Sequence, residues 1–197
     1  MAVHVLDPPS RERGASPRAG AVLRPLTRCQ IDDRLEELGD VYARSWDAGE
    51  AARARFLRRL ADAVRRPGFA LMLAGNTDPT GLAYGFPVRV DGGPGEGLGA
   101  YLPPGLFQLA AAGRLFAIPE IVVPPEACRR YQGRDWNLAR RLQMQLLHDN
   151  DAALGVTLVR RGDIRMLETL RSWGWRCVPA GPGAHLPVLR RALILHP

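Results

Sequence analysis

The stretch EIVVPPEACRRYQGRDWNLARRLQMQLL, residues 120–147, decides the fold of this chain. It continues an apolar run that predicts a strand over 116–123, and it ends in a pattern that predicts a helix from about 136 to 148. Leu138, Leu142 and Leu146 repeat every four residues and share one face of that helix. Between strand and helix lies a basic segment with a single glycine, and proteins often hold phosphate groups in loops of this kind.

The basic segment has the residue types that an anion site needs. A helix N-terminus presents unpaired backbone N–H groups, and Gly133 lets the backbone approach an anion closely. Arg129, Arg130 and Arg134 add charge-assisted donors suited to phosphate oxygens. A solvated basic loop that leads into a surface helix is the alternative, and local physics leaves both interpretations open.

The flanking sequence predicts an α/β domain. Two amphipathic helices are expected between residues 31 and 66, and a hairpin over 69–90 has turn chemistry at Asp78 and Pro79. Further elements are predicted as strands over 21–27, 155–161, 175–180 and 187–195, and as helices over 106–114 and 163–174. We therefore expect one domain over 21–197 with a mixed sheet, preceded by a disordered leader over 1–20.

Composition limits the possible partners. The net charge is +7, and all 27 basic residues are arginine because the chain has no lysine. Such a surface attracts phosphorylated cofactors, acidic small molecules or nucleic acid, but no DNA- or RNA-binding motif is present, so nucleic acid is not the expected partner. No window approaches the roughly 18 apolar residues of a membrane span. Since the first twenty residues also lack a signal-peptide core, we expect no membrane partner and a cytoplasmic location.

The three cysteines lack metal-ligand spacing, so no metal site is expected. Cys128 stands beside Arg129 and Arg130, which would lower a thiol pKa, and a catalytic thiol there is a minor alternative.

After residue 20 the chain resembles the GCN5-related N-acetyltransferase (GNAT) superfamily. In that family a strand, a turn of the form [Q/R]-x-x-G-x-[G/A] and a helix hold the coenzyme A pyrophosphate. The resemblance places Gln132, Gly133 and Arg134 in this loop and the start of its helix at LARRL, residues 138–142. It implies a mixed, mostly antiparallel central sheet flanked by helices. It also implies that the backbone of Ile121, Val122 and Val123 pairs with the pantetheine of acetyl-coenzyme A or another acyl-coenzyme A.

A second segment, LVRRGDIRMLETLRSWGW (158–175), is similar to the family's N-x-x-A-x-x-x-Y-x-x-x-G-[F/W] helix. Its most specific match is the run Arg171-Ser172-Trp173-Gly174-Trp175. At the position of the usual general acid, a tyrosine, this chain has Leu170, and Asp163 replaces the asparagine near the helix start.

The cofactor loop also departs from the family pattern. In an ungapped alignment Asp135 takes the final small-residue position, and in a second alignment two extra residues fall within 135–137. We predict that Asp135 caps the following helix and occupies the N–H groups that a phosphate would use. Coenzyme A binding is therefore expected to be weakened or lost.

Glu120 is the candidate general base, because a carboxylate precedes the same strand in many members of the family. A surface carboxylate at the strand end is an equal alternative. Tyr84 and Tyr101 are candidates for replacing the missing acid. Tyr42, Trp46 and Phe56 are expected to pack in the core of the helical layer.

These features predict an N-acyltransferase that moves an acyl group from acyl-coenzyme A to an amine of a small molecule. The alternative is a catalytically degenerate protein of the same fold that acts as a binding or regulatory module. Nucleic-acid binding by the basic surface is a distant third. The resemblance further suggests a homodimer.

Overall fold

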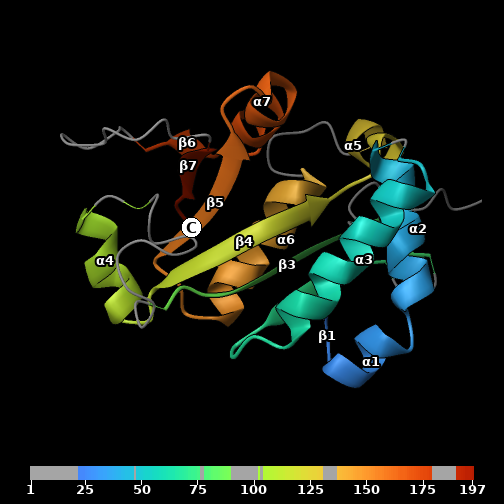
Figure 1. Cartoon of the computed structure of the whole chain (residues 1–197), viewed down its shortest axis with the longest axis horizontal. Helices are drawn as coiled ribbons and strands as arrows, with labels where there is room; N and C mark the ends of the chain where they lie inside the picture. The colour runs from blue at the N-terminus through green and yellow to red at the C-terminus, as the bar shows by residue number, and fades with distance from the viewer. Residues whose placement is uncertain are drawn as a thin grey trace, which may run out of the picture.

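A computed structural model describes residues 22–46, 48–75, 78–89, 102, 104–130, 137–178 and 190–197. The predicted leader and the candidate loop residues Gln132, Gly133, Arg134 and Asp135 lie outside these ranges, as does Tyr101. In chain order the elements are β1 (Leu23–Leu26), α1 (Arg28–Asp32), α2 (Leu35–Trp46), α3 (Glu50–Val64), β2 (Ala70–Ala74), β3 (Gly81–Pro87), α4 (Pro104–Ala111), β4 (Leu115–Val122), α5 (Pro125–Arg130), α6 (Leu138–Asp149), β5 (Leu154–Arg160), α7 (Ile164–Ser172), β6 (Arg176–Cys177) and β7 (Arg190–Leu195) (Figure 1).

Within the described ranges the strands form one sheet in the order β1-β2-β3-β4-β5-β7-β6. The described neighbours pair antiparallel except β4 and β5, which run parallel. The predicted mixed, mostly antiparallel sheet is thus confirmed. β7 follows β6 in sequence but lies between β5 and β6 in the sheet.

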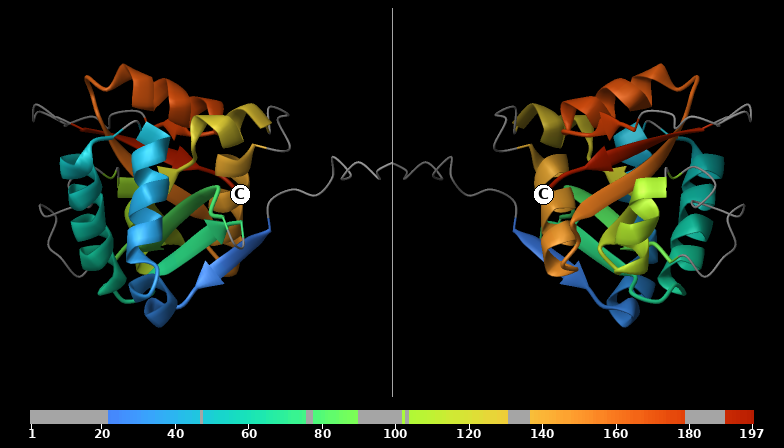
Figure 2. Two further views of the ribbon diagram at one scale, coloured as in Figure 1. Left: turned by 90° about the vertical axis from the view of Figure 1, so that its right-hand side faces the viewer. Right: turned by 90° about the vertical axis from the view of Figure 1, so that its left-hand side faces the viewer.

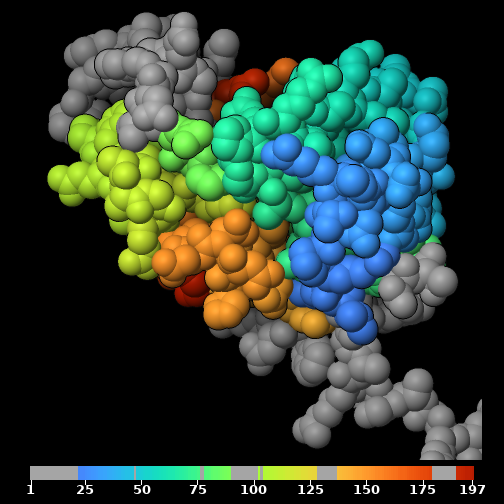
Figure 3. All heavy atoms as spheres, turned by 90° about the horizontal axis from the view of Figure 1, so that it is seen from below, coloured from blue at the N-terminus to red at the C-terminus, as the bar shows by residue number. Residues whose placement is uncertain are grey.

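Helices cover both faces of this sheet. On one face α2 and α3 bury an apolar cluster that includes Leu38, Phe56 and Leu60 against β2 and β3. The other face is covered by α6 (Figure 2). This helix packs against the sheet through its leucine stripe. Figure 3 shows the molecule from below, where α6 lies between α4 and the β1–α1 segment. The two faces therefore have separate cores, and a third buried cluster joins α4 to β4 and β5 through Leu106, Leu115 and Val156. Side-chain alternation along each strand decides which cluster a residue enters.

Two sequence expectations need correction. The segment after β4, expected to be loop throughout, contains helix α5, because Pro125 suits a first helical position and Glu126 stands in the first turn. Trp46, expected in the core, is 37% exposed at the end of α2. Phe56 is fully buried and its ring stacks on that of partly buried Tyr42, with the two ring centres 4.4 Å apart, as expected for core residues.

A buried polar pair ties α6 to the segment after α7. Gln143 is fully buried and its side chain donates to the Ala139 carbonyl at 2.7 Å. The Trp175 indole N–H donates to the Gln143 side-chain oxygen. Because both groups lie in an apolar core, each needs the other as a hydrogen-bond partner.

We predict that Trp175→Phe and Gln143→Met each lower the free energy of unfolding by about 1–3 kcal/mol, since each leaves a buried polar group unpaired. The double variant should lose less than the sum of the two, and urea unfolding of the four proteins measures this coupling. Strictly additive losses would show that the pair does not interact.

Candidate active site

Strand β4 contains a β-bulge that sets the direction of Glu120. Tyr84 pairs with Glu120 and Phe86 with Ala117, so two steps along β3 match three steps along β4. Before the bulge, Phe116 and Ile118 face α6. In a regular strand the same alternation would point Glu120 into that apolar core. After it Ile121 faces α6 instead, and Glu120 turns to the α2–α3 side of the sheet.

The sequence specifies this bulge from both strands. Pro119 has no backbone N–H to donate to a ladder and is exposed on β4. Across from it, a Cβ atom on Gly85 would lie 2.2 Å from the Ala117 carbonyl oxygen and 2.5 Å from the Phe116 ring. Only glycine lets the two strands approach so closely.

Glu120 meets an arginine on the α3 side. The Arg59 guanidinium donates to a Glu120 carboxylate oxygen at 2.9 Å. The Glu120 side chain is 14% exposed and the Arg59 side chain 48% exposed, so the acid is nearly enclosed while the cation reaches solvent. Buried Tyr84 lies opposite Glu120 in the ladder, and Arg59 lies 5.9 Å from the centre of the Tyr42 ring.

These surroundings shift the pKa values of the cluster. Burial raises the pKa of Glu120 above its ordinary value, and the positive charge of Arg59 offsets part of that rise. Burial is the largest single effect on the pKa of Arg59 and lowers it, but the charge of Glu120 and the hydrogen bonds to Glu120 and Tyr42 together outweigh burial and raise this pKa. Tyr84 also has a raised pKa, through burial first and the Glu120 charge second, so its phenol stays protonated at neutral pH. Glu120 is thus enclosed beside a cation, and the surface-carboxylate alternative does not describe it.

Arg59 was not identified from the sequence. From the sequence, the arginines over 53–66 fit the solvated face of an amphipathic helix, and this description holds for exposed Arg58 and Arg65. Phe56, Leu60 and Ala63 are the buried residues of α3, and Arg59 stands three residues after Phe56, beside that buried stripe. This spacing was the signal that could have separated Arg59 from its neighbours.

Glu120 makes stability depend on pH in a definite direction. A carboxyl group whose folded pKa lies above the ordinary 4.5 stabilises the fold below that pH, and its contribution is lost as the pH rises through the folded value. The groups that face Glu120 are Arg59 on α3, Tyr84 on β3 and, through Arg59, Tyr42 on α2.

We predict that Arg59→Met raises the Glu120 pKa further and steepens the loss of stability from about pH 4.5 upward, to at most about 1.4 kcal/mol per pH unit for one proton. Urea unfolding at a series of pH values measures this slope. Arg65→Met, which removes an exposed arginine from the end of the same helix, should leave the slope unchanged. A slope that stays the same in Arg59→Met would contradict the assignment.

β4 and β5 separate next to the bulge. Their pairing is limited to Leu115–Ala117 of β4, opposite Leu154, Gly155 and Val156 of β5. Figure 1 shows the two strands diverging beyond this point. The proposed pantetheine-pairing residues follow the separation: Ile121 and Val122 on β4, and Val123 directly after it. The side chains of Ile121 and Val123 face α6 and that of Val122 faces α2–α3.

Helix α6 begins at Leu138, later than the periodicity suggested and at the residue where the family resemblance placed its start. Its N-cap is Asn137, whose side chain accepts from the Arg140 backbone N–H at 3.2 Å. The prediction that Asp135 caps this helix is wrong, because Asn137 is the residue with extended backbone directly before the first helical turn. Arg129 and Arg130 are the last two residues of α5 rather than parts of an open loop.

A pocket of about 320 Å³ lies where β4 ends. Its lining comes from α2, the β2–β3 turn and the start of α5, namely Arg44, Asp78, Pro79, Thr80, Pro124, Glu126 and Ala127. Arg44 donates to the Pro79 carbonyl at 3.2 Å and holds two of these elements together. The pocket gives space for a ligand beyond the end of the strand that carries Glu120.

Helix α7 supplies no acid at the expected position. Leu170 is 4% exposed and packs in the α6-side core. Asp163 is the α7 N-cap and accepts from the Met166 backbone N–H at 3.0 Å. Gly174 ends the helix with a φ of 100°, and Trp173 and Trp175 on either side are both buried. The matched tryptophans thus have a structural role.

The described residues contain no group of three or more histidine, cysteine, aspartate or glutamate side chains that could hold a metal ion. None of their helices combines the length and apolar character needed to cross a membrane.

Comparison with known proteins extends the description of the fold. No protein-family model matches the sequence, and no curated protein matches it. Solved structures do match: the PaiA N-acetyltransferase from Thermoplasma acidophilum, in complex with coenzyme A, is 10% identical with a TM-score of 0.56, over 90% of this chain and 99% of that one.

Two further solved structures are similar to the same extent. An acetyltransferase attributed to the GNAT family from Desulfovibrio desulfuricans is 11% identical with a TM-score of 0.54, over 90% of this chain and 99% of that one. An acetyltransferase from Streptococcus agalactiae is 10% identical with a TM-score of 0.53, over 91% and 99%. At such low identity the likeness concerns architecture alone. The chain has the fold of the GNAT acetyltransferases.

Proposed function

We propose that this protein transfers an acyl group from acyl-coenzyme A to the amine of a small molecule. The observation that carries the proposal is the position of Glu120: an enclosed carboxylate, turned by a bulge toward the α2–α3 side, next to the point where β4 and β5 separate. Enclosed titratable groups beside a strand bulge are typical of functional sites.

The residues around the separation fit the pantetheine part of the cofactor. Pairing between β4 and β5 stops at Ala117, and after the bulge β4 pairs from Glu120 to Val122 with β3 alone among the described strands. An extended, amide-containing chain can align with such a strand by backbone hydrogen bonds. Gln132, Gly133 and Arg134, with Arg129 and Arg130, are the residues we propose for the pyrophosphate.

Acyl-coenzyme A, when bound, supplies the acyl carbon as a thioester whose thiol is the leaving group. Glu120 accepts the proton that the attacking amine must lose, directly or through one water. Burial raises the pKa of Glu120, and Arg59 offsets part of that rise and so favours the ionised form, which is the form that can accept the proton. Holding the amine beside Glu120 supplies much of the acceleration by proximity, so a missing tyrosine at Leu170 need not abolish transfer.

A second candidate is a catalytically degenerate protein that keeps the fold as a binding or regulatory module. Leu170 favours it, because a buried leucine at the general-acid position cannot protonate a thiolate. Such a protein would still bind a ligand at the β4–β5 separation, and it would show no turnover with any amine.

Calorimetric titration with acetyl-coenzyme A and with coenzyme A tests the cofactor binding that both candidates share, and a turnover assay then separates them. We expect the natural chain to bind and Asp135→Gly to bind more tightly, since Asp135 adjoins the proposed phosphate-binding residues in sequence. Two like charges about 4 Å apart repel by roughly 1–4 kcal/mol. Asp151→Gly is the matched control, because Asp151 lies beyond α6 with a positive φ that glycine adopts easily. Thiol release across a panel of amines then tests turnover. No binding by any variant would exclude both transfer and a coenzyme A module.

A further inference from the structure

Arg59 is the charged side chain best placed to recognise the acceptor. Arg59 contacts Glu120 at 2.9 Å. Any amine that delivers its proton to Glu120 must therefore approach the guanidinium closely. Nearly half of the Arg59 side chain is exposed although Glu120 is enclosed. The guanidinium therefore has donors left for a ligand, since it carries five N–H groups in all.

The charges of the cluster disfavour a purely cationic acceptor. Arg59 and Glu120 neutralise each other, and the raised pKa of the neighbouring Tyr84 keeps its phenol uncharged at neutral pH. An arriving ammonium group competes with Arg59 for Glu120. If the ammonium group displaces Arg59 from Glu120, the guanidinium loses its ion-pair partner in a site that is partly shielded from water. An uncompensated charge in such a site is destabilising. An acceptor that also carries an anionic group avoids this penalty, because its amine binds Glu120 and its anionic group binds Arg59.

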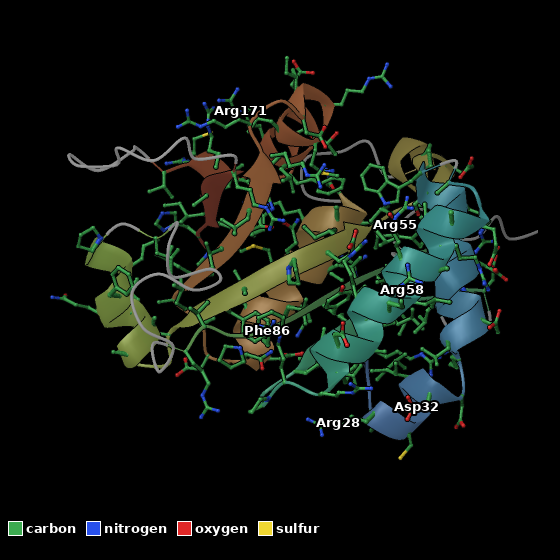
Figure 4. All side chains as sticks on the ribbon, viewed as in Figure 1. Arg28, Asp32, Arg55, Arg58, Phe86 and Arg171 are labelled. Carbon is green, nitrogen blue, oxygen red and sulfur yellow. The ribbon has the colours of Figure 1, made fainter. Side chains whose placement is uncertain are left out.

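Neighbouring residues on α3 add to the same preference. Arg55 and Arg58 are exposed on α3 (Figure 4). They precede Arg59 by four residues and by one residue, so the three share one side of the helix. The ion pairs recorded for α3 involve Arg53, Arg59 and Arg65, and within the described residues none involves Arg55 or Arg58. Like charges on one helix face raise the local positive potential, which attracts anions and repels polyamines.

We infer that the acceptor is an amino acid or a close analogue, in which a carboxylate stands a few bonds from the amine, and that Arg59 binds this carboxylate. The inference rests on the proposed acyl transfer and names its substrate class. Arg59 is the specificity-determining residue, and Glu120 takes the proton of the amine. The planar guanidinium matches a carboxylate in a two-point contact, which a lysine cannot reproduce.

The test compares each proteinogenic L-amino acid with its own carboxamide as acceptor. The two share the amine and the side chain, and the carboxamide amine is the weaker base, so it is the more available nucleophile at neutral pH. We expect kcat/KM to favour the carboxylate by roughly 10–100-fold for at least one amino acid, the range for a hydrogen bond to a charged group. Arg59→Met should abolish the preference, Arg59→Lys should keep part of it, and Arg65→Met should leave it unchanged.

The outcomes separate this inference from the proposed function. Turnover of carboxamides or simple amines with an efficiency equal to that of amino acids would overturn the inference and leave acyl transfer standing. If no acceptor is acylated, acyl transfer fails, and calorimetric binding of the same acid and amide pairs to the natural chain decides the inference. Binding of the acid alone, lost in Arg59→Met, would support it. Equal binding of acid and amide, or binding of neither, would overturn it.

Discussion

Glu120→Gln is expected to lower kcat for acyl transfer by about 10²–10⁴-fold, the contribution of a positioned general base. Glutamine has nearly the same shape, and its amide oxygen can still accept from Arg59, but it cannot take a proton from the acceptor. Steady-state thiol release measures kcat. Calorimetry with acetyl-coenzyme A should give an unchanged affinity, because Glu120 faces the α2–α3 side of β4.

Glu168→Gln is the matched control for this experiment. It makes the same chemical change at an exposed position on α7, away from the β4–β5 separation, and should leave kcat within twofold. An unchanged kcat in Glu120→Gln would remove Glu120 from the reaction and leave proximity as the source of catalysis.

The largest effect on stability is expected from Gly85→Ala. The new methyl group would stand 2.2 Å from the Ala117 carbonyl oxygen, and backbone cannot move aside as the end of a flexible side chain can. We expect a loss of at least about 3 kcal/mol in the free energy of unfolding, at the upper end for overpacking. Relief of the clash would push β4 away from β3 at the bulge. The surviving folded protein should therefore also lose turnover, because Glu120 would no longer be aimed at Arg59.

Gly105→Ala tests whether that loss is specific to the bulge. Gly105 lies in α4, and a Cβ atom there meets nothing within 4 Å. This substitution should stabilise the protein by up to about 1 kcal/mol, because alanine is the better helix former. Chemical unfolding of both variants and of the natural chain should show a lower free energy of unfolding for Gly85→Ala and a higher one for Gly105→Ala. A Gly85→Ala protein as stable as the natural chain would mean that β4 can adopt another register.

The elements that sequence predicted well are those with a local pattern. The leucine repeat at residues 138, 142 and 146 identified α6 because helical periodicity is complete within one segment. The hairpin of β2 and β3 followed from a turn between two apolar runs, and Gly174 ended α7 as expected. In each case the deciding contacts join residues close together in the chain.

The site depends on contacts between distant segments, and sequence predicted less of it. Glu120 was proposed from a resemblance, but its direction depends on a bulge that Gly85 and Pro119 create from different strands. Arg59 is 61 residues from its partner and looked like one more solvated arginine. The Asp135 cap was wrong because two plausible caps stood two residues apart, and the local pattern could not place the first helical turn.

The place of β7 between β5 and β6 has a consequence for the order of folding. β6 pairs with β7, so it has no recorded partner in the sheet until Arg190–Leu195 have reached β5. During synthesis β1 to β4 can pair before translation ends. β5 keeps one edge unpaired until β7, which begins about 30 residues after β5 ends, has been synthesised. In that interval the unpaired backbone edge of β5, with its apolar side chains, is exposed to other nascent chains. We therefore expect chaperone dependence and misassembly to centre on β5, and a nascent chain stalled before residue 190 to expose the greatest length of unpaired strand.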